Sequence, residues 1–151
     1  MVEPRFQMGL MPDAKLIRTE VFIDEQGYHD EFDADEDRCW NLVLYLNGTP
    51  ISTGRLLEVD PETYRIQRIA VRKPYRGQKV GSYTVKFLIT KARSLGARKV
   101  ILGSQMDKQG FYKTLGFRPF PDGEVYFDEG HPHVMMYKVI VTKNKPSRIS
   151  Y

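Results

Sequence analysis

The stretch 68–81 constrains the fold of this chain more than any other. It begins as an apolar run that ends at Val71, turns at Pro74, and continues as a basic loop with Gly77 that opens onto a helical pattern. The first N–H groups of a helix have no intrahelical partner, and the helix dipole adds partial positive charge there. This layout is typical of a main-chain phosphate site. A second apolar run, at 100–102, completes a βαβ crossover.

Apolar periodicity predicts a mixed α/β chain. Alternating or short apolar runs indicate strands, and apolar residues recurring at helical spacing indicate helices. The sequence Asn47-Gly48 favours a tight turn between two of the strands. We expect an antiparallel meander, then the crossover with 64–71 and 100–102 parallel, and helices flanking the mixed sheet. The expected strands are 4–10, 40–46, 51–59, 64–71, 99–103, 117–120 and 134–141, and the expected helices are 13–26, 79–95 and 105–115.

The first of these helices has a plausible start signal and an apolar face. Asp13 is the expected N-cap, because its carboxylate can accept a bond from an unpaired N–H of the first turn. The residues expected to face inward are Leu16, Ile17, Val21 and Phe22.

Charge is distributed unevenly along the chain. Eleven Lys or Arg residues and no Asp or Glu fall within 65–99, whereas nine of the 19 acidic residues fall within 20–37, which contains no Lys or Arg. We therefore expect a phosphate-rich ligand on one side of the molecule and a cationic, amine-bearing ligand on the other. Asp33, Asp35 and Asp37 begin like a calcium loop, but Arg38 and Leu44 occupy the positions of its glycine and final glutamate. We expect no metal site.

Length and composition bound the remaining expectations. At 151 residues the chain suits one domain, which we place at 1–141, followed by a basic tail at 142–151. Cys39 is the single cysteine, so an intrachain disulfide is excluded, and we expect it in the core. No apolar run reaches the ~20 residues of a membrane span, and the first residues lack a signal-peptide layout. A soluble, cytoplasmic protein is expected, with a nuclear location left open.

Five segments, in order, resemble the GNAT superfamily of acetyl-CoA-dependent N-acyltransferases, and more narrowly its ElaA-like branch. Together they cover most of the chain from about residue 15 to 140, which makes the resemblance far more specific than the phosphate loop alone. The segments are 21–27, 54–56, 69–81 with Tyr75-Arg76-Gly77 and Gly81, 109–117 with Phe111-Tyr112 and Gly116-Phe117, and 129–133 with Glu129-Gly130-His131-Pro132-His133.

The resemblance implies a single-domain GNAT fold with splayed parallel strands, and direct transfer of an acetyl group from acetyl-CoA, as cosubstrate, to a primary amine. It implies that the Val71 amide binds the thioester oxygen and that Tyr112 protonates the CoA sulfur. The base is left open among Glu25, His133 and Glu20, with a chain of ordered water molecules as a further route for the proton; histidine is the side chain that changes charge near neutral pH. The residues implied to bind acetyl-CoA are Ile69, Ala70, Val71, Arg76, Gly77, Gln78, Lys79, Val80, Gly81 and Ser82.

The phosphate loop departs from the family pattern at one position. Lys79 stands where the family usually has its first glycine. A lysine still offers its backbone N–H and adds an ammonium group, but its Cβ brings bulk toward the pyrophosphate.

Two other classes of function stay open at this stage. The basic segment 65–99 and tail favour a nucleic-acid-binding module, but no nucleic-acid motif accompanies them, so we do not expect nucleic acid as a partner. A CoA-binding protein with little catalytic activity is the second alternative, because Lys79 replaces glycine and the strand 64–71 lacks a glutamate. The resemblance also implies a homodimer, for which the sequence offers no interface.

Overall fold

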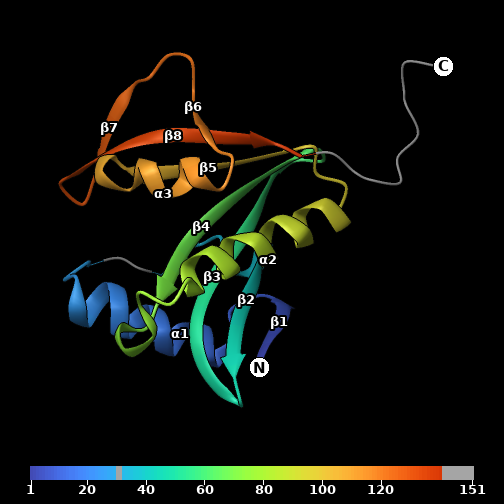
Figure 1. Cartoon of the computed structure of the whole chain (residues 1–151), viewed down its shortest axis with the longest axis vertical. Coiled ribbons are helices and arrows are strands. Elements are labelled where there is room, and N and C mark those ends of the chain that lie inside the picture. Colours follow the sequence, from blue (N-terminus) through green and yellow to red (C-terminus); the bar gives the residue numbers. More distant parts are fainter. Residues whose placement is uncertain (30–31, 141–151) are drawn as a thin grey trace.

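A single mixed sheet organises the computed structural model, which describes residues 1–29 and 32–140. Its strand order is β1-β2-β3-β4-β5-β8-β6, with β7 paired to β8 (Figure 1). The strands are β1 Val2–Met8, β2 Cys39–Leu46, β3 Thr49–Asp60, β4 Thr63–Val71, β5 Lys99–Gln105, β6 Arg118–Pro119, β7 Val125–Asp128 and β8 His131–Val139. The helices are α1 Pro12–Arg18, α2 Val80–Ser94 and α3 Gln109–Thr114, with a π-helical turn η1 Thr19–Glu25 and short 3₁₀ turns η2 Glu36–Arg38, η3 Lys73–Tyr75 and η4 Met106–Lys108.

The first four strands form the expected antiparallel meander. Asn47 and Gly48 both have positive φ, 50° and 87°, as the tight hairpin turn between β2 and β3 requires. The register of β3 against β4 shifts near Gly54, where Arg68 adopts a left-handed φ of 58°. This bulge makes the second half of β4 depart from the regular ladder, next to the site described below.

The predicted βαβ crossover is confirmed, and its two parallel strands separate. Pairing between β4 and β5 runs only from Thr63 with Lys99 to Ile66 with Leu102. Beyond this point β4 and β5 diverge, which Figure 1 shows as a V between the lower and upper parts of the sheet. The later half of each strand therefore has a free edge facing the other across the V.

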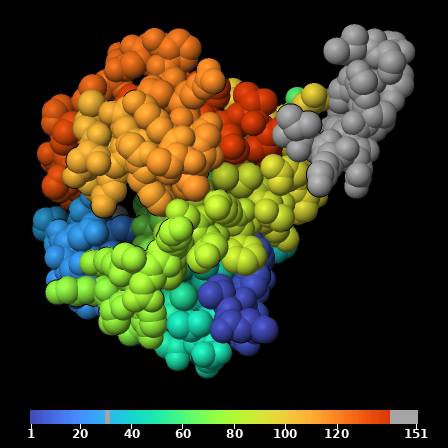
Figure 2. Space-filling model, viewed as in Figure 1, coloured from blue at the N-terminus to red at the C-terminus, as the bar shows by residue number. Residues whose placement is uncertain are grey.

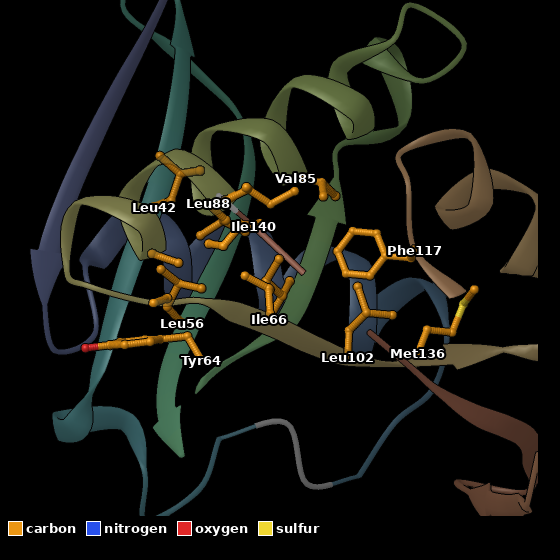
Figure 3. Close-up of a cluster of buried hydrophobic side chains, with 14 of the residues drawn as sticks. Leu42, Leu56, Tyr64, Ile66, Val85, Leu88, Leu102, Phe117, Met136 and Ile140 are labelled. Atoms are coloured by element: carbon orange, nitrogen blue, oxygen red, sulfur yellow. The ribbon is translucent and has the colours of Figure 1, made fainter. Parts of the chain in front are cut away.

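The main core lies between the sheet and α2. Leu42, Leu56, Ile66, Leu88 and Leu102 are at most 3% exposed and pack together in Figure 3. Gly54 allows α2 to approach β3 closely, because a Cβ there would lie 2.7 Å from Leu88 Cδ1. Since side chains alternate across a strand, the residues between the core positions of β4, Arg65 and Gln67, face the opposite side, which α1 and η1 flank.

Several local expectations are wrong. Asp13 does not cap α1: Met11 holds the N-cap position without a side-chain bond, and Asp13 instead accepts a hydrogen bond of 2.6 Å from the Tyr45 hydroxyl. Leu16 is 51% exposed, whereas Ile17 and Val21 are buried. The helix expected at 105–115 begins only at Gln109, because β5 continues to Gln105. Strand β7 was not expected at all.

Cys39 lies fully buried at the start of β2, as expected, and burial raises the pKa of its thiol.

Within 1–29 and 32–140, no helix has the length and apolar character needed to cross a membrane. The predicted basic tail, 142–151, lies outside the described residues, as does residue 141 of the last expected strand.

Candidate active site

A cavity of about 840 Å³ occupies the V between β4 and β5. In Figure 2 the residues around α3 stand above those leading into α2, with the first helix at the side. The cavity brings together most of the residues predicted for the site, but Gln78, Glu25 and Glu20 are not among its lining residues. The predicted residues that line it are Ile69, Ala70, Val71, Arg76, Gly77, Lys79, Val80, Gly81, Ser82, Tyr112 and His133.

The loop before α2 presents main-chain donors to this cavity. Gly77 and Lys79 both have left-handed φ values, 78° and 66°, and Lys79 is the N-cap of α2. The first intrahelical bond after the cap runs from the Tyr83 N–H to the Lys79 carbonyl at 3.1 Å, and no side chain caps the helix. The N–H groups of Val80, Gly81 and Ser82 thus have no helical acceptor, which suits an anion.

The Val71 amide points into the V. Val71 pairs with Ser52, and the neighbouring Arg72 N–H donates to the Ile51 carbonyl at 3.0 Å, which identifies Val71 and Ser52 as a non-hydrogen-bonded pair. The N–H and C=O of Val71 therefore face away from β3, toward β5, which has already separated. The carbonyl accepts a 2.8 Å bond from Arg76 Nε, so the amide is the remaining main-chain donor at this point.

Tyr112 lies on α3, on the same side of the sheet as α2. Its ring packs edge-on against Phe111 and Phe117, with centroids 5.0 and 5.9 Å apart. Burial raises the pKa of Tyr112 to about 12. The hydroxyl therefore keeps its proton at neutral pH and is available as a proton donor inside the cavity.

His133 lies on β8 and reaches the cavity from the opposite side of the sheet, because it alternates with the core residue Val134. Its Nδ1 lies 2.8 Å from the His131 carbonyl oxygen, and its ring stacks on Tyr126 at 5.5 Å between centroids. A carbonyl oxygen can only accept, so Nδ1 carries the proton in this bond. In the neutral ring, Nε2 then carries the lone pair.

The other two base candidates are engaged in ion pairs. Glu25 receives two bonds from Arg76, one of them Nη2 to Oε1 at 2.8 Å, and this hydrogen bonding lowers the pKa of Glu25. Glu20 accepts from Arg72 Nε at 3.0 Å. These pairs connect η1 to the segment that follows β4, and so hold the phosphate loop against the first helix.

The acidic segment is tied to the sheet by arginines. Arg18 and Arg55, each 1% exposed, bind Glu36 at 2.8 and 3.0 Å, and Arg55 also binds Asp33 at 2.8 Å. The hydrogen bond from Arg55 lowers the pKa of Asp33 to about 2. These two carboxylates are therefore structural groups rather than a free acidic surface for a cationic ligand.

The cavity residues that sequence reasoning did not assign to the site include Arg65, Gln67, Gln105 and Tyr126, on the far side from α2. In the expected strand 64–71, period-2 alternation places Arg65 and Gln67 on the face opposite the core, which was the available signal. Gln105 had no such signal, because a helix was expected to begin there. Tyr126 had no such signal, because β7 was not predicted. It approaches β5 only because Gly103 has no side chain: a Cβ there would overlap the Tyr126 hydroxyl.

Comparison with known proteins agrees with this architecture. A family model described as the acetyltransferase (GNAT) family matches residues 10–117. Protein YyaT of Bacillus subtilis is 33% identical over 133 residues, covering 85% of this chain and 88% of that protein. Protein ElaA of Escherichia coli is 31% identical over 131 residues, covering 83% of this chain and 84% of ElaA.

Solved structures share the fold. The crystal structure of Escherichia coli ElaA has a TM-score of 0.79 at 27% identity and covers 91% of this chain and 99% of its own. A Lactobacillus plantarum protein reaches a TM-score of 0.83 at 29% identity, covering 93% and 99%. A Bacillus subtilis acetyltransferase crystallised in complex with CoA has the same fold at a TM-score of 0.71 and 21% identity, covering 92% and 100%. The chain therefore belongs to the GNAT family of acetyltransferases, in the branch that includes ElaA.

Proposed function

We propose that this protein is an N-acetyltransferase that moves an acetyl group directly from acetyl-CoA to a primary amine. Membership of the GNAT family supports acetyl transfer. The observation that carries the proposal is the cavity, which joins the free N–H groups at the start of α2 to the His133 imidazole through the V between β4 and β5. One ligand can thus enter from each side of the sheet and meet the other at the Val71 amide.

Acetyl-CoA is the cosubstrate and supplies the activated acetyl group. The main chain of 79–82 holds its pyrophosphate at the start of α2, and Arg76 and Lys79 add positive charge beside it. The Val71 N–H donates to the thioester oxygen, where negative charge develops during attack. Glu25 orients Arg76 through its two bonds, so that the loop is positioned before the ligand binds.

The two proton transfers fall to residues on opposite sides of the sheet. His133 Nε2 takes a proton from the acceptor ammonium, which frees the nitrogen lone pair to form a C–N bond with the acetyl carbon. The C–S bond breaks, and the Tyr112 hydroxyl gives its proton to the departing sulfur. As the C–S bond breaks, the nitrogen loses its second proton to solvent, and the products are the N-acetyl amide and CoA with its free thiol. His133 then gives its proton to solvent and Tyr112 regains one, so that one proton is released overall.

Among the candidate bases, we propose His133 over Glu25 and Glu20. His133 lines the cavity, and its Nδ1 bond leaves Nε2 as the acceptor atom. Glu25 lies outside the cavity lining, and its bonds to Arg76 lower its pKa, which weakens it as a base.

The test combines acetyl-CoA binding with release of CoA thiol in the presence of a panel of primary amines. We expect saturable one-to-one binding by calorimetry and amine-dependent thiol release. His133→Gln should lower kcat/KM about 100-fold and remove the acid limb of its pH profile, with acetyl-CoA binding unchanged. Glu25→Gln should instead weaken acetyl-CoA binding and leave that limb in place.

Binding without amine-dependent thiol release for any amine would contradict the acetyltransferase proposal and favour the CoA-binding alternative. An acid limb that persists in His133→Gln but disappears in Glu25→Gln would transfer the role of base to Glu25.

A further inference from the structure

Arg65 is an unneutralised cation on the acceptor side of the cavity. It lies on β4 opposite Ile101 of β5, within the last pairs before the two strands separate. Its Nε is buried without a hydrogen-bond partner, its Nη2 lies 3.8 Å from the Met135 sulfur, a weak acceptor, and its side chain also interacts with the uncharged hydroxyl of Tyr126. No carboxylate of residues 1–29 and 32–140 forms an ion pair with it. A guanidinium in this state has donors available for a ligand.

The neighbouring arginines differ from Arg65 in this respect. Arg55 binds both Asp33 and Glu36, and Arg68 binds Asp33 at 3.3 Å. Among these arginines of β3 and β4, Arg65 is therefore the one whose positive charge is not paired with a carboxylate of the described residues.

Gln67 adds a second donor on the same face of β4, two residues further along. Its Oε1 accepts a 3.0 Å bond from Arg55 Nε, which fixes the orientation of the amide. The amide NH₂ has no acceptor among the described residues, and Gln67 lines the cavity. Arg55 thus orders a donor toward the same space that Arg65 faces. Two successive outward positions of one strand present N–H groups and no free acceptor.

We propose that the acetyl acceptor is an amine that also carries a carboxylate, of the amino-acid class, and that Arg65 and Gln67 bind this carboxylate. The inference rests on the proposed N-acetyltransferase function and specifies its substrate. A carboxylate accepts two parallel bonds from a guanidinium fork and has lone pairs left for the Gln67 amide. Its single negative charge matches the single unneutralised guanidinium, whereas a phosphate dianion would leave charge unmatched.

The rest of the cavity suits the ammonium end of such a molecule. His133 offers its Nε2 lone pair, and Asp128 and Glu129 line the same cavity as carboxylates. Tyr126 contacts both ends: its ring stacks on His133, and it lies close enough to Arg65 for the guanidinium to oppose the rise that burial causes in the pKa of Tyr126. The lining thus places a cationic donor and a proton acceptor next to the same aromatic ring.

The experiment compares matched acceptors that differ only at the carboxyl group. For alanine, lysine, glutamate and phenylalanine, the free amino acid, its carboxamide, the amine without the carboxyl group and the aminophosphonate analogue are assayed for thiol release from acetyl-CoA. We expect kcat/KM for the preferred amino acid to exceed that for its carboxamide about 10- to 100-fold. Arg65→Met should reduce this ratio to about 1, and Arg65→Lys should keep part of it.

Arg98→Met is the matched control, because Arg98 is an exposed arginine of the loop before β5 that pairs only weakly with Glu62, at 3.8 Å. It should leave the ratio unchanged. Binding of the same compounds to the CoA-loaded protein is measured by calorimetry, which does not depend on turnover. Acetyl-CoA binding to Arg65→Met should match that of the unaltered protein, since Arg65 lies on the opposite side of β4 from α2.

The outcomes separate this proposal from the enzyme function on which it rests. Amino-acid binding that Arg65→Met abolishes, without turnover of any amine, would support the carboxylate site and contradict acetyl transfer. Turnover in which the carboxamide or the simple amine equals the acid would overturn the carboxylate site and leave the acetyltransferase function standing. Preference for the aminophosphonate, a preference that survives in Arg65→Met, or no binding of any compound would also overturn it.

Discussion

The two sides of the V between β4 and β5 offer different kinds of groups to a ligand. On the side of α2, the donors are mainly backbone N–H groups, those of 80–82 and of Val71 at the edge of β4. On the other side, the polar groups are side chains: Arg65, Gln67 and His133. Backbone donors depend on the course of the chain and tolerate changes of side chain, whereas side-chain donors change with every substitution. The first side therefore suits an invariant cosubstrate, and the second suits selection among acceptors.

The largest expected effect is a loss of kcat from a substitution on the α2 side that leaves the backbone unchanged. Tyr112→Phe removes only a hydroxyl, and the ring stays between Phe111 and Phe117. We expect kcat to fall 10²- to 10⁴-fold, with acetyl-CoA affinity by calorimetry within about twofold. Tyr137→Phe on β8, outside the cavity, is the control and should retain full activity. Equal activity of the two variants would exclude Tyr112 as the acid.

A large loss of stability is expected when the buried ion pairs behind the acceptor side of the cavity are removed. Arg55→Met removes the buried cation from Asp33 and one of the two buried cations from Glu36, which keeps Arg18, and this should lower the free energy of unfolding by about 3 kcal/mol. Arg38→Met removes an arginine from the same acidic segment, but its pair with Asp35 is exposed, and we expect a change under about 1 kcal/mol. Urea unfolding of the two variants measures the contrast, and similar losses would show that burial does not matter here.

A smaller effect tests whether the α2 side binds acetyl-CoA through backbone N–H groups and not through the Lys79 side chain. Lys79 has φ 66°, so Lys79→Gly should raise stability by about 1 kcal/mol, because glycine adopts this conformation without strain. Lys79→Ala keeps the strain and removes the ammonium group. Acetyl-CoA affinity should stay within about fivefold in both variants. A loss above tenfold in both would instead make the Lys79 ammonium a principal phosphate ligand.

The smallest effect is a pH dependence confined to the acceptor side. The bond from Arg55 lowers the pKa of Asp33 from 3.8 to about 2. A lowered folded-state pKa stabilises the fold above the unfolded value, and this stabilisation is lost as pH falls from about 4 to about 2. Because Asp33 is 37% exposed, the loss should be well below that of Arg55→Met. Asp33→Asn should flatten the decline in urea midpoint over this range; an unchanged slope would contradict the assignment.

Much of the fold followed from local patterns. The hairpin at Asn47-Gly48, the meander, the crossover and α2 were all predicted within a few residues, because alternation and helical spacing record which face of each element is buried. Errors arose where a residue distant in the sequence forms an interaction that replaces the one expected from the local pattern. Asp13 has the chemistry of an N-cap, yet the Tyr45 hydroxyl, 32 positions away, takes its carboxylate.

The candidate site divides in the same way. The phosphate loop, Val71 and Tyr112 were predicted from motifs that are contiguous in the chain. The pairs Arg76–Glu25 and Arg55–Asp33 join positions 51 and 22 residues apart, and no periodicity predicts which charges will meet. For the same reason, Arg65 could not be singled out from the sequence. The role that we propose for it depends on the lack of a carboxylate partner among the described residues, and not on its residue type.

By itself, the sequence determined the order of elements, the start of α2 with its preceding basic, glycine-bearing loop, and the family, because each depends on residues adjacent in the chain. Only the tertiary structure decided that β4 and β5 separate after Ile66 and Leu102, that the Val71 amide faces the gap, and which arginines are neutralised. The physical reason is that strand pairing and ion pairing are settled by which distant groups can meet without leaving a buried polar group unsatisfied.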